Sequence, residues 1–335
     1  MLDIFIQNIT SAVVLFFLLG IIASLVKSDL AIPKPISEGL SIYLLIAIGL
    51  KGGVELAKYP LSTIIVPTVA TILLGVSLPI LAMVLLKMMK IDLYNSIGLA
   101  ATYGSVSIVT YGATISFFEK QAITYEGYMH AMVVIMESPA IITSILLMKM
   151  LEKAKEVPSA VSYQTLGITR SASLLDKHIW KETFFGKSVL LLLGSLCIGY
   201  VVQEEGFLMV KPLFSDFYGS MLALFLLYMG LVAGERLTEL KAYGWKLILF
   251  AVMAPVIFGT IGVLVGNAIG LSVGGATIFG VLAGSASYIA APAALKTSVP
   301  KANPSIYIGL ALGITFPFNL AIGIPLIYKI AQLLQ

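Results

Sequence analysis

Apolar residues form long runs along this chain, and short polar segments with charged residues, Pro or Gly separate the runs. A helix needs about 20 predominantly apolar residues to cross a bilayer, and fewer when it packs inside a bundle. The pattern therefore predicts an all-α polytopic membrane protein with ten transmembrane helices. These spans are expected at residues 7–26, 36–50, 61–86, 93–118, 127–148, 188–202, 217–233, 247–269, 275–295 and 304–328.

The only long polar stretch, residues 149–187, lies between the fifth and sixth predicted spans and is rich in Ser, Lys and Glu. We interpret it as a linker outside the membrane. It separates a first five-helix unit at residues 1–148 from a second at 188–335. The first span is expected to be retained, because Asp3 and no Lys or Arg precedes it, unlike the start of a cleaved signal peptide.

The composition of the 335 residues agrees with a membrane protein, since 59% are apolar and only 11% are charged. Soluble domains have about 45–50% apolar and about 25% charged residues. The net charge of +4 comes from scattered Lys rather than from a basic face, which argues against nucleic-acid binding. Cys197 is the only Cys, and His130 and His178 are the only His, so we expect neither a disulfide scaffold nor a transition-metal site.

The positive charges are distributed unequally between the two sides of the predicted bundle. Sixteen of the 21 Lys and Arg residues fall in loops that follow odd-numbered spans, and five fall on the other side. Because cytoplasmic loops carry the excess of Lys and Arg, we expect the linker in the cytoplasm and both termini outside it. The predicted location is the cell (inner) membrane.

Three sequence matches between the two units indicate an internal repeat. Residues 49–53 (GLKGG) recur as 230–234 (GLVAG), residues 104–107 (GSVS) recur as 284–287 (GSAS), and Pro139 corresponds to Pro317. The offsets are nearly equal, at 181, 180 and 178 residues. Because each unit has five spans, the second must be inverted relative to the first. Inverted repeats of this kind are typical of secondary transporters.

Gly-Ser-rich segments fall in the middle of the fourth and ninth predicted spans, where Gly and Ser weaken a helix. Unwound backbone at that depth is tolerated where it lines a cavity. We therefore predict that both spans are broken and that helix N-termini and hydroxyl groups there bind a small anion. The alternative is that Gly and Ser only allow close helix packing. The predicted substrate-binding residues are Gly104, Ser105, Val106, Ser107, Thr110, Gly284, Ser285, Ala286 and Ser287.

Glu137 is the only acidic residue that we place near the middle of a span. A carboxylate at that depth costs about 2.5–3.5 kcal/mol on insertion scales, and no predicted span has Lys or Arg at the same depth. A bound cation or a proton must therefore compensate it; a protonated, structural Glu is the alternative. Thr315 and Asn319 offer neutral oxygen ligands at the corresponding place in the second unit. For His130 we predict a structural role.

Four segments carry a resemblance to a known family. They are residues 48–53 (IGLKGG), the first Gly-Ser segment followed by 124–126 (TYE), 137–140 (ESPA), and 300–309 (PKANPSIYIG). They follow one another along nearly the whole chain. On these motifs the chain resembles the sodium-dependent bicarbonate transporters of the cyanobacterial type.

The resemblance implies a homotrimer in which each chain has a gate domain (spans 1, 2, 6 and 7) and a core domain (spans 3, 4, 5, 8, 9 and 10). It implies that bicarbonate lies between the broken fourth and ninth helices, with sodium nearby. Transport would follow an elevator-type shift of the core, and a cytoplasmic PII-like protein would regulate it. By position, the cation-binding residues would be Glu137, Ser107, Thr110, Ser287 and Thr315. The chain departs from the family pattern at Ile108, Val109 and Tyr288, the last in place of an expected Asp.

The function that we expect is sodium-coupled uptake of bicarbonate or a similar small anion, with no enzymatic activity and no cofactor besides the coupling ion. A symporter for another small carboxylate, and a proton-coupled transporter of the same fold, stay open because of the three departures. A non-transporting membrane sensor or scaffold is an alternative of another class. An intramembrane hydrolase would need one Ser paired with His130, whereas the sequence repeats the Ser segment and offers no second such His.

Overall fold

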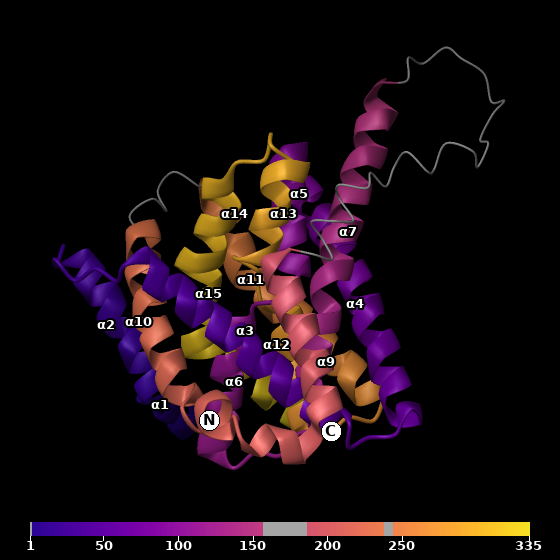
Figure 1. The fold of residues 1–335 in the computed structure, drawn as a ribbon. Helices are drawn as coiled ribbons and strands as arrows, with labels where there is room; N and C mark the ends of the chain where they lie inside the picture. The colour runs from indigo at the N-terminus through magenta and orange to yellow at the C-terminus, as the bar shows by residue number, and fades with distance from the viewer. Residues whose placement is uncertain (1, 157–185, 238–243) are drawn as a thin grey trace.

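In a computed structural model the structure describes residues 2–156, 186–237 and 244–335. Every regular element within these ranges is a helix, and the helices form one bundle (Figure 1). The predicted all-α membrane fold is confirmed. The predicted linker lies mostly outside the described residues, but its first residues, up to Glu156, continue the fifth predicted span as a helix.

Seven helical segments of the described chain are long and apolar enough to cross a membrane. They are α3 (Lys34–Leu56), α4 (Leu61–Met88), α7 (Met129–Glu156), α9 (Lys187–Leu208), α10 (Tyr218–Leu237), α11 (Gly244–Ala268) and the stretch from α14 (Pro304–Leu310) to α16 (Ile324–Leu334). The last stretch also contains η4 (Ala311–Thr315), α15 (Phe316–Phe318) and η5 (Asn319–Gly323), of which η4 and η5 are π-helical. Each of the seven corresponds to one predicted span.

The other three predicted spans are each divided between two helices. The pairs are α1 (Leu2–Ile9) with α2 (Ala12–Leu25), α5 (Leu93–Gly104) with α6 (Ile108–Gln121), and α12 (Val273–Ala283) with α13 (Ala290–Ser298). The last two divisions were predicted. The first corrects the prediction of one span at residues 7–26. There Thr10 and Ser11 bond to nearby backbone groups, and Ser11 caps α2, so these polar side chains compete with a continuous helix.

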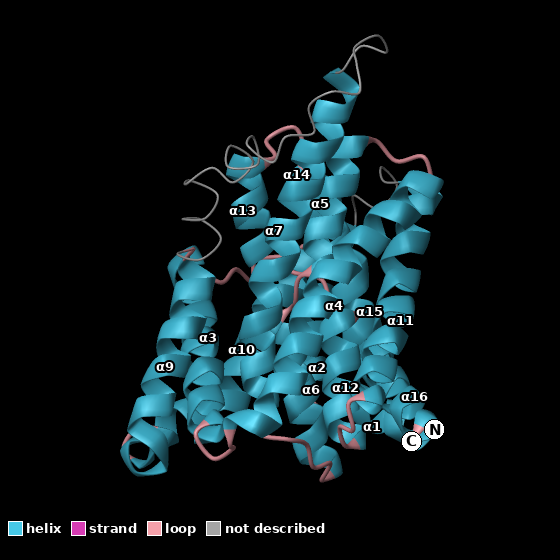
Figure 2. Ribbon diagram, turned by 90° about the vertical axis from the view of Figure 1, so that its right-hand side faces the viewer, coloured by secondary structure: helices cyan, strands magenta, loops and turns pink. Residues whose placement is uncertain are grey.

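Both chain termini lie at one end of the bundle, which we call the terminal face, at the bottom of Figure 1. The end of α7 and the start of α9 lie toward the opposite end, the linker face (Figures 1 and 2). α3 runs in the same direction as α9, since Gly49 lies against Ser195 and Gly53 against Gly199. It begins near the linker face and ends at the terminal face (Figure 1). It extends six residues beyond the predicted end at residue 50 and carries Lys51 and Glu55 to the terminal face.

Two seams of small residues join the halves of the chain. α2 packs along α10, and α3 packs along α9. In the first seam Gly230 lies against Gly20, and a Cβ atom on Gly230 would overlap the carbonyl oxygen of Phe17. In the second seam Gly53 lies against Gly199 in the same way. Helices in membranes pack this closely where Gly, which has no side chain, allows the two backbones to come into contact.

Candidate functional site

The first helix break lies between α5 and α6 and consists of Ser105, Val106 and Ser107. Gly104 is the last residue of α5, and its Cα faces the ring of Pro79 on α4 so closely that a Cβ would overlap the ring. The Ser107 hydroxyl caps α6 by accepting from the backbone N–H of Thr110 at 3.1 Å. The first-turn N–H groups of α6 have no partner within the helix and point into the break.

The second break lies between α12 and α13 and is longer, from Gly284 to Ile289. The Ser287 hydroxyl accepts from the backbone N–H of Ala291 at 3.2 Å, near the start of α13. Pro292 follows in the first turn of α13 and has no N–H to offer. The second break therefore directs fewer free N–H groups toward its own gap than the first.

The two breaks meet inside the bundle. The backbone N–H of Ser107 donates to the hydroxyl oxygen of Ser285 at 2.9 Å, and the backbone N–H of Ser287 donates to the carbonyl oxygen of Thr102 at 2.8 Å. All nine predicted substrate-binding residues are buried there. In this arrangement Ser285 occupies the position at the start of α6 where an anion would receive the Ser107 N–H.

Glu137 lies on α7 beside the first break and is 1% exposed. The hydroxyl of Ser105 donates to the Glu137 backbone carbonyl at 3.4 Å, which joins α7 to the break. The carboxylate atom Oε2 has no hydrogen-bond partner among the described residues, and neither does the buried hydroxyl of Thr102. A buried carboxylate oxygen without a partner requires a proton or a cation.

The predicted cation-binding hydroxyls do not all converge. The hydroxyls of Ser107 and Thr110 lie 2.9 Å apart, whereas the Thr315 hydroxyl donates to the Ala251 carbonyl and contacts the Tyr103 hydroxyl, each at 2.7 Å. Thr315 thus connects α5, η4 and α11. No group of three His, Cys, Asp or Glu side chains that could hold a metal ion occurs in residues 2–156, 186–237 and 244–335.

Asn319 supports the second break from the π-helical segment of the last predicted span. Its side-chain amide donates to the Gly284 carbonyl at 2.9 Å. This bond satisfies a carbonyl at the end of α12 that the helix leaves unpaired. π-helical turns are frequent at functional sites, and the two turns here, η4 and η5, contain Thr315 and Asn319 respectively.

A cavity of about 300 Å³ opens from the linker face and reaches the second break. Ser37, Glu38 and Lys187 line its mouth, and Tyr288 and Ile289 line its inner end. The Tyr288 hydroxyl is buried and has no hydrogen-bond partner among the described residues. Its ring packs edge-on against Phe316 at 5.5 Å.

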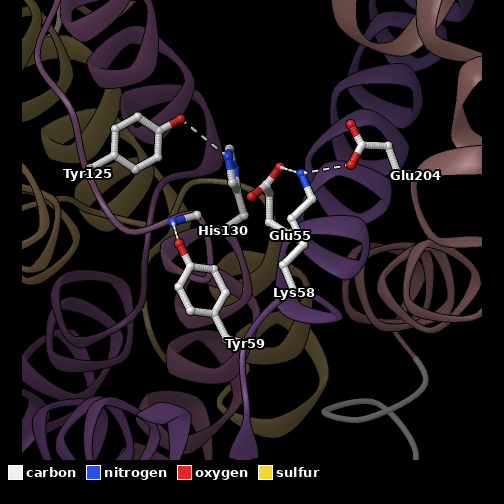
Figure 3. Close-up of polar contacts among 7 residues, drawn as sticks. Glu55, Lys58, Tyr59, Tyr125, His130 and Glu204 are labelled. Atoms are coloured by element: carbon white, nitrogen blue, oxygen red, sulfur yellow. Dashed lines mark hydrogen bonds and ion pairs between the residues drawn. The ribbon is translucent and has the colours of Figure 1, made fainter.

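A second cavity, of about 390 Å³, opens on the terminal face and ends at His130 (Figure 3). The two ring nitrogens of His130 lie near tyrosine hydroxyls, Nδ1 at 2.6 Å from Tyr111 and Nε2 at 3.3 Å from Tyr125. Tyr111 is in the first turns of α6, so these side chains separate the cavity from the first break. Sequence analysis did not predict the contacts of Tyr103 with Thr315 or of Tyr111 and Tyr125 with His130. These pairs are either distant in sequence or have a spacing that matches no known motif.

A family model described as the Na⁺-dependent bicarbonate transporter superfamily matches residues 12–332. This match confirms the resemblance that the sequence motifs indicated, and it is to a family of transporters rather than of enzymes. The comparison with curated proteins gives no match.

Proposed function

Since this chain belongs to the Na⁺-dependent bicarbonate transporter superfamily, we propose that it is a secondary active transporter that couples sodium to the uptake of bicarbonate or a similar small anion. The observation that carries the proposal is the meeting of the two helix breaks, at the hydrogen bond between Ser107 and Ser285. Two broken helices whose free backbone groups face one buried gap form an ion site without a fixed charge.

The anion would be held by the start of α6. Its N–H groups carry the positive end of the helix dipole, and a small oxyanion accepts from such groups. For the anion to receive the Ser107 N–H, the Ser285 hydroxyl must leave it and turn toward the anion as a donor. The Ser105, Thr110 and Ser287 hydroxyls and the backbone at Gly104, Val106, Gly284 and Ala286 complete the proposed substrate site.

The sodium ion would sit beside the anion and be held by Glu137. Hard cations take oxygen ligands, and the unpartnered Glu137 Oε2 atom needs a positive partner. The Ser107 and Thr110 hydroxyls are adjacent to the break that Glu137 contacts. Ser287 and Thr315 would join them after a rearrangement that releases Thr315 from Ala251.

An inverted repeat of two five-helix units, ten crossings in all, explains the pairing of helices across the halves. In each unit the second span presents two small-residue positions, four residues apart, to the first span of the other unit. The contacts are Gly49 with Ser195 and Gly53 with Gly199 in one seam, and Gly230 with Gly20 and Gly234 with Ser24 in the other.

The loops before the fifth and tenth predicted spans support the same symmetry. Glu126 accepts from the backbone N–H of Ser272, 2.7 Å away, at the start of α12. Near the start of α5, the side-chain oxygen of Asn95 accepts from the backbone N–H of Asn303 at 2.9 Å. In each case a loop from one half holds the beginning of the broken helix of the other half.

The four seam helices α2, α3, α9 and α10, together with α1 from the first predicted span, would form the gate domain, and the remaining helices the core domain that moves in an elevator-type step. The linker-face and terminal-face cavities lie on the same boundary between these sets of helices, which supports a sliding contact there. We further propose that the terminal face is outside the cell. The homotrimer and the PII-like regulator stay predictions from the resemblance.

Proton coupling is the second candidate, and one observation favours it. Tyr288 stands where the family resemblance implies an Asp, so the site has one carboxylate fewer for a cation, and Glu137 alone could carry a proton instead. A small carboxylate other than bicarbonate could also bind as substrate, because the hydroxyl and backbone N–H donors of the proposed site would suit any small anion with carboxylate oxygens. A non-transporting sensor or scaffold would need neither Glu137 nor two joined breaks.

Uptake into proteoliposomes tests the proposal. The wild-type protein should accumulate radiolabelled bicarbonate when a sodium gradient is imposed, and more strongly than other anions of a panel that includes formate, acetate and nitrate. Accumulation driven by a proton gradient alone would establish the second candidate. If bicarbonate uptake is unaffected by either gradient, and S105A and E137Q take up as much as the wild type, the chain is not the proposed symporter.

A further inference from the structure

The cavity on the terminal face has a lining that the proposed transport site does not use. It lies between the ends of α3 and α9 on one side and the loop between α6 and α7 on the other. Its charged lining residues come from several parts of the chain: Lys51, Glu55, Lys58, Glu204 and Lys211. The charges are therefore brought together by the fold and not by a local sequence motif.

The two acidic residues of this lining share one internal cation, which offsets part of their charge. The Lys58 ammonium group lies 2.8 Å from a Glu55 carboxylate oxygen and 3.5 Å from a Glu204 carboxylate oxygen (Figure 3). The hydrogen bond to Glu55 raises the pKa of Lys58 above its usual value, so Lys58 stays charged. Because an internal cation occupies the place between the carboxylates, the pair does not offer a sodium site.

The two other lysines of the lining, Lys51 and Lys211, take part in no ion pair of the described residues. The Lys51 ammonium group lies 5.6 Å from the centre of the Tyr218 ring. The lining has three lysines against two glutamates, so its net charge is +1. A recess with low-dielectric walls and a net charge of one sign concentrates ions of the opposite sign. This recess therefore favours anions.

The inner end of the cavity is polar and lies close to the first helix break. Burial raises the pKa of Tyr125, so its phenol stays neutral and can donate a hydrogen bond. His130 connects Tyr125 to Tyr111, which follows Ser107 on α6 by one helical turn. An anion at this end would meet hydroxyl and imidazole groups and would be one layer of side chains away from the start of α6.

We propose that this cavity is a second anion site, an outer vestibule in which Lys51 and Lys211 collect a small oxyanion before it reaches the helix breaks. The identity of the anion as bicarbonate rests on the proposed function, and the term outer rests on the proposed orientation. The vestibule raises the local concentration of the anion and leaves the transport step itself to the breaks.

Transport kinetics give the first test. In K51Q/K211Q the KM for external bicarbonate should rise about fivefold or more with an unchanged maximal rate, because only the local concentration falls. External salt should raise the KM of the wild type and change that of the variant much less. The matched control K87Q/K90Q removes two exposed charges near the linker face and should behave as wild type. An unchanged KM, or a lower maximal rate at unchanged KM, overturns the vestibule.

A chemical test needs neither transport nor loss of the lysines. Ser215 lines the cavity, and Cys197 is an exposed free cysteine, so S215C in a C197S background gives one reporter thiol. Two methanethiosulfonate reagents are compared, one bearing a sulfonate and the other a trimethylammonium group. The ratio of the sulfonate rate to the trimethylammonium rate should be several times higher for this thiol than for a free thiol in solution. Bicarbonate should slow the sulfonate reagent, and K51Q/K211Q should abolish the preference.

The two tests separate the two proposals. If the wild type transports no bicarbonate but the thiol at position 215 shows the sulfonate preference and bicarbonate protection, the proposed transport function fails and the vestibule stands. If transport occurs but the thiol shows no sulfonate preference or no protection, the vestibule is overturned and the function stands.

Discussion

The break between α5 and α6 is short and capped by its own serine, whereas the break between α12 and α13 is longer and is supported by Asn319 from another helix. The first leaves the N–H groups of the initial turn of α6 facing the gap. The second has Pro292 in the corresponding turn and contributes the Ser285 hydroxyl to the first break instead. We therefore propose different tasks for the similar segments: the first would supply donors for an anion, and the second would close over them.

The cation chemistry is also confined to one half. Glu137 on α7 has an unpartnered carboxylate oxygen beside the first break, whereas the corresponding stretch of the second half offers only Thr315 and Asn319, both already hydrogen-bonded. The proposed repeat would account for the shared framework. From the difference between the halves we propose that the coupling ion binds on the side of the first half.

The largest expected effect is the loss of sodium-driven uptake when the Glu137 carboxylate is removed, compared with a change at Thr315 in the other half. E137Q should lower sodium-driven uptake by about tenfold to a hundredfold or more, since loss of even an outer-shell partner of a metal ligand weakens metal binding by about that factor. The melting temperature of E137Q should not fall, because Gln fits the same space and needs no compensating charge. T315V is the comparison and should reduce uptake less. Sodium-stimulated uptake by E137Q equal to wild type would remove Glu137 from the ion site.

The next effect compares the two capping serines. S107A and S287A each remove one cap, so each should lose about 1 kcal/mol of stability. Only S287A should also raise the KM for bicarbonate, by about tenfold, because its hydroxyl would donate to the anion and one hydrogen bond to a charged group is worth about 1.5–3 kcal/mol, whereas S107A keeps the backbone N–H that would hold the anion. Uptake kinetics and thermal melting on the same preparations check this. Equal KM changes in the two variants would contradict different roles for the breaks.

A smaller effect compares the two seams. A Cβ on Gly53 would meet the backbone of α9 at Leu196 and Tyr200, whereas a Cβ on Gly234 would meet mainly the side chain of Ser24. Backbone cannot move aside as a side chain can, so G53A should lose about 1–3 kcal/mol, and G234A less. G39A, with open space around it, is the control and should melt at or slightly above the wild-type temperature, because Ala favours a helix more than Gly does. The reverse order would mean that α3 and α9 are not packed as described.

The smallest effect compares the two loops that hold the broken helices. E126A removes a carboxylate that accepts from the N–H and the hydroxyl of Ser272 at the start of α12. N95A removes a neutral acceptor for the N–H of Asn303. Because hydrogen bonds to a charged group are the stronger, E126A should lower stability by about 1 kcal/mol and N95A by less. Thermal melting at low and high salt measures both, and only the E126A difference should shrink with salt.

Sequence analysis located the breaks because Gly and Ser stand in the middle of apolar runs, and that signal is local. It missed the division between α1 and α2, where Thr10 and Ser11 are equally local but lie near the start of the run. It also ended the second span before Lys51. Charged residues were taken as a boundary, whereas the structure continues α3 because Lys51 and Glu55 face the terminal-face cavity.

The composition of the site was harder to predict than its location. Ser285 was assigned to the anion from its place in the repeat, but its bond to the Ser107 N–H depends on how two distant segments pack. The contact of Thr315 with Tyr103 and the contact of His130 with Tyr111 likewise join elements with no shared spacing. Contacts of this kind follow from three-dimensional packing, and one sequence contains no record of them.

The most direct test of the central claim is a pair of cryo-electron microscopy maps of the protein in lipid, with sodium bicarbonate and with neither ion. We expect the bicarbonate map to show density within hydrogen-bond distance of the Ser107 N–H, with the Ser285 hydroxyl turned away from that N–H. The ion-free map should retain the bond between Ser107 and Ser285. If the bond is present in both maps and no density appears between the two breaks, the anion does not bind there and the account is wrong.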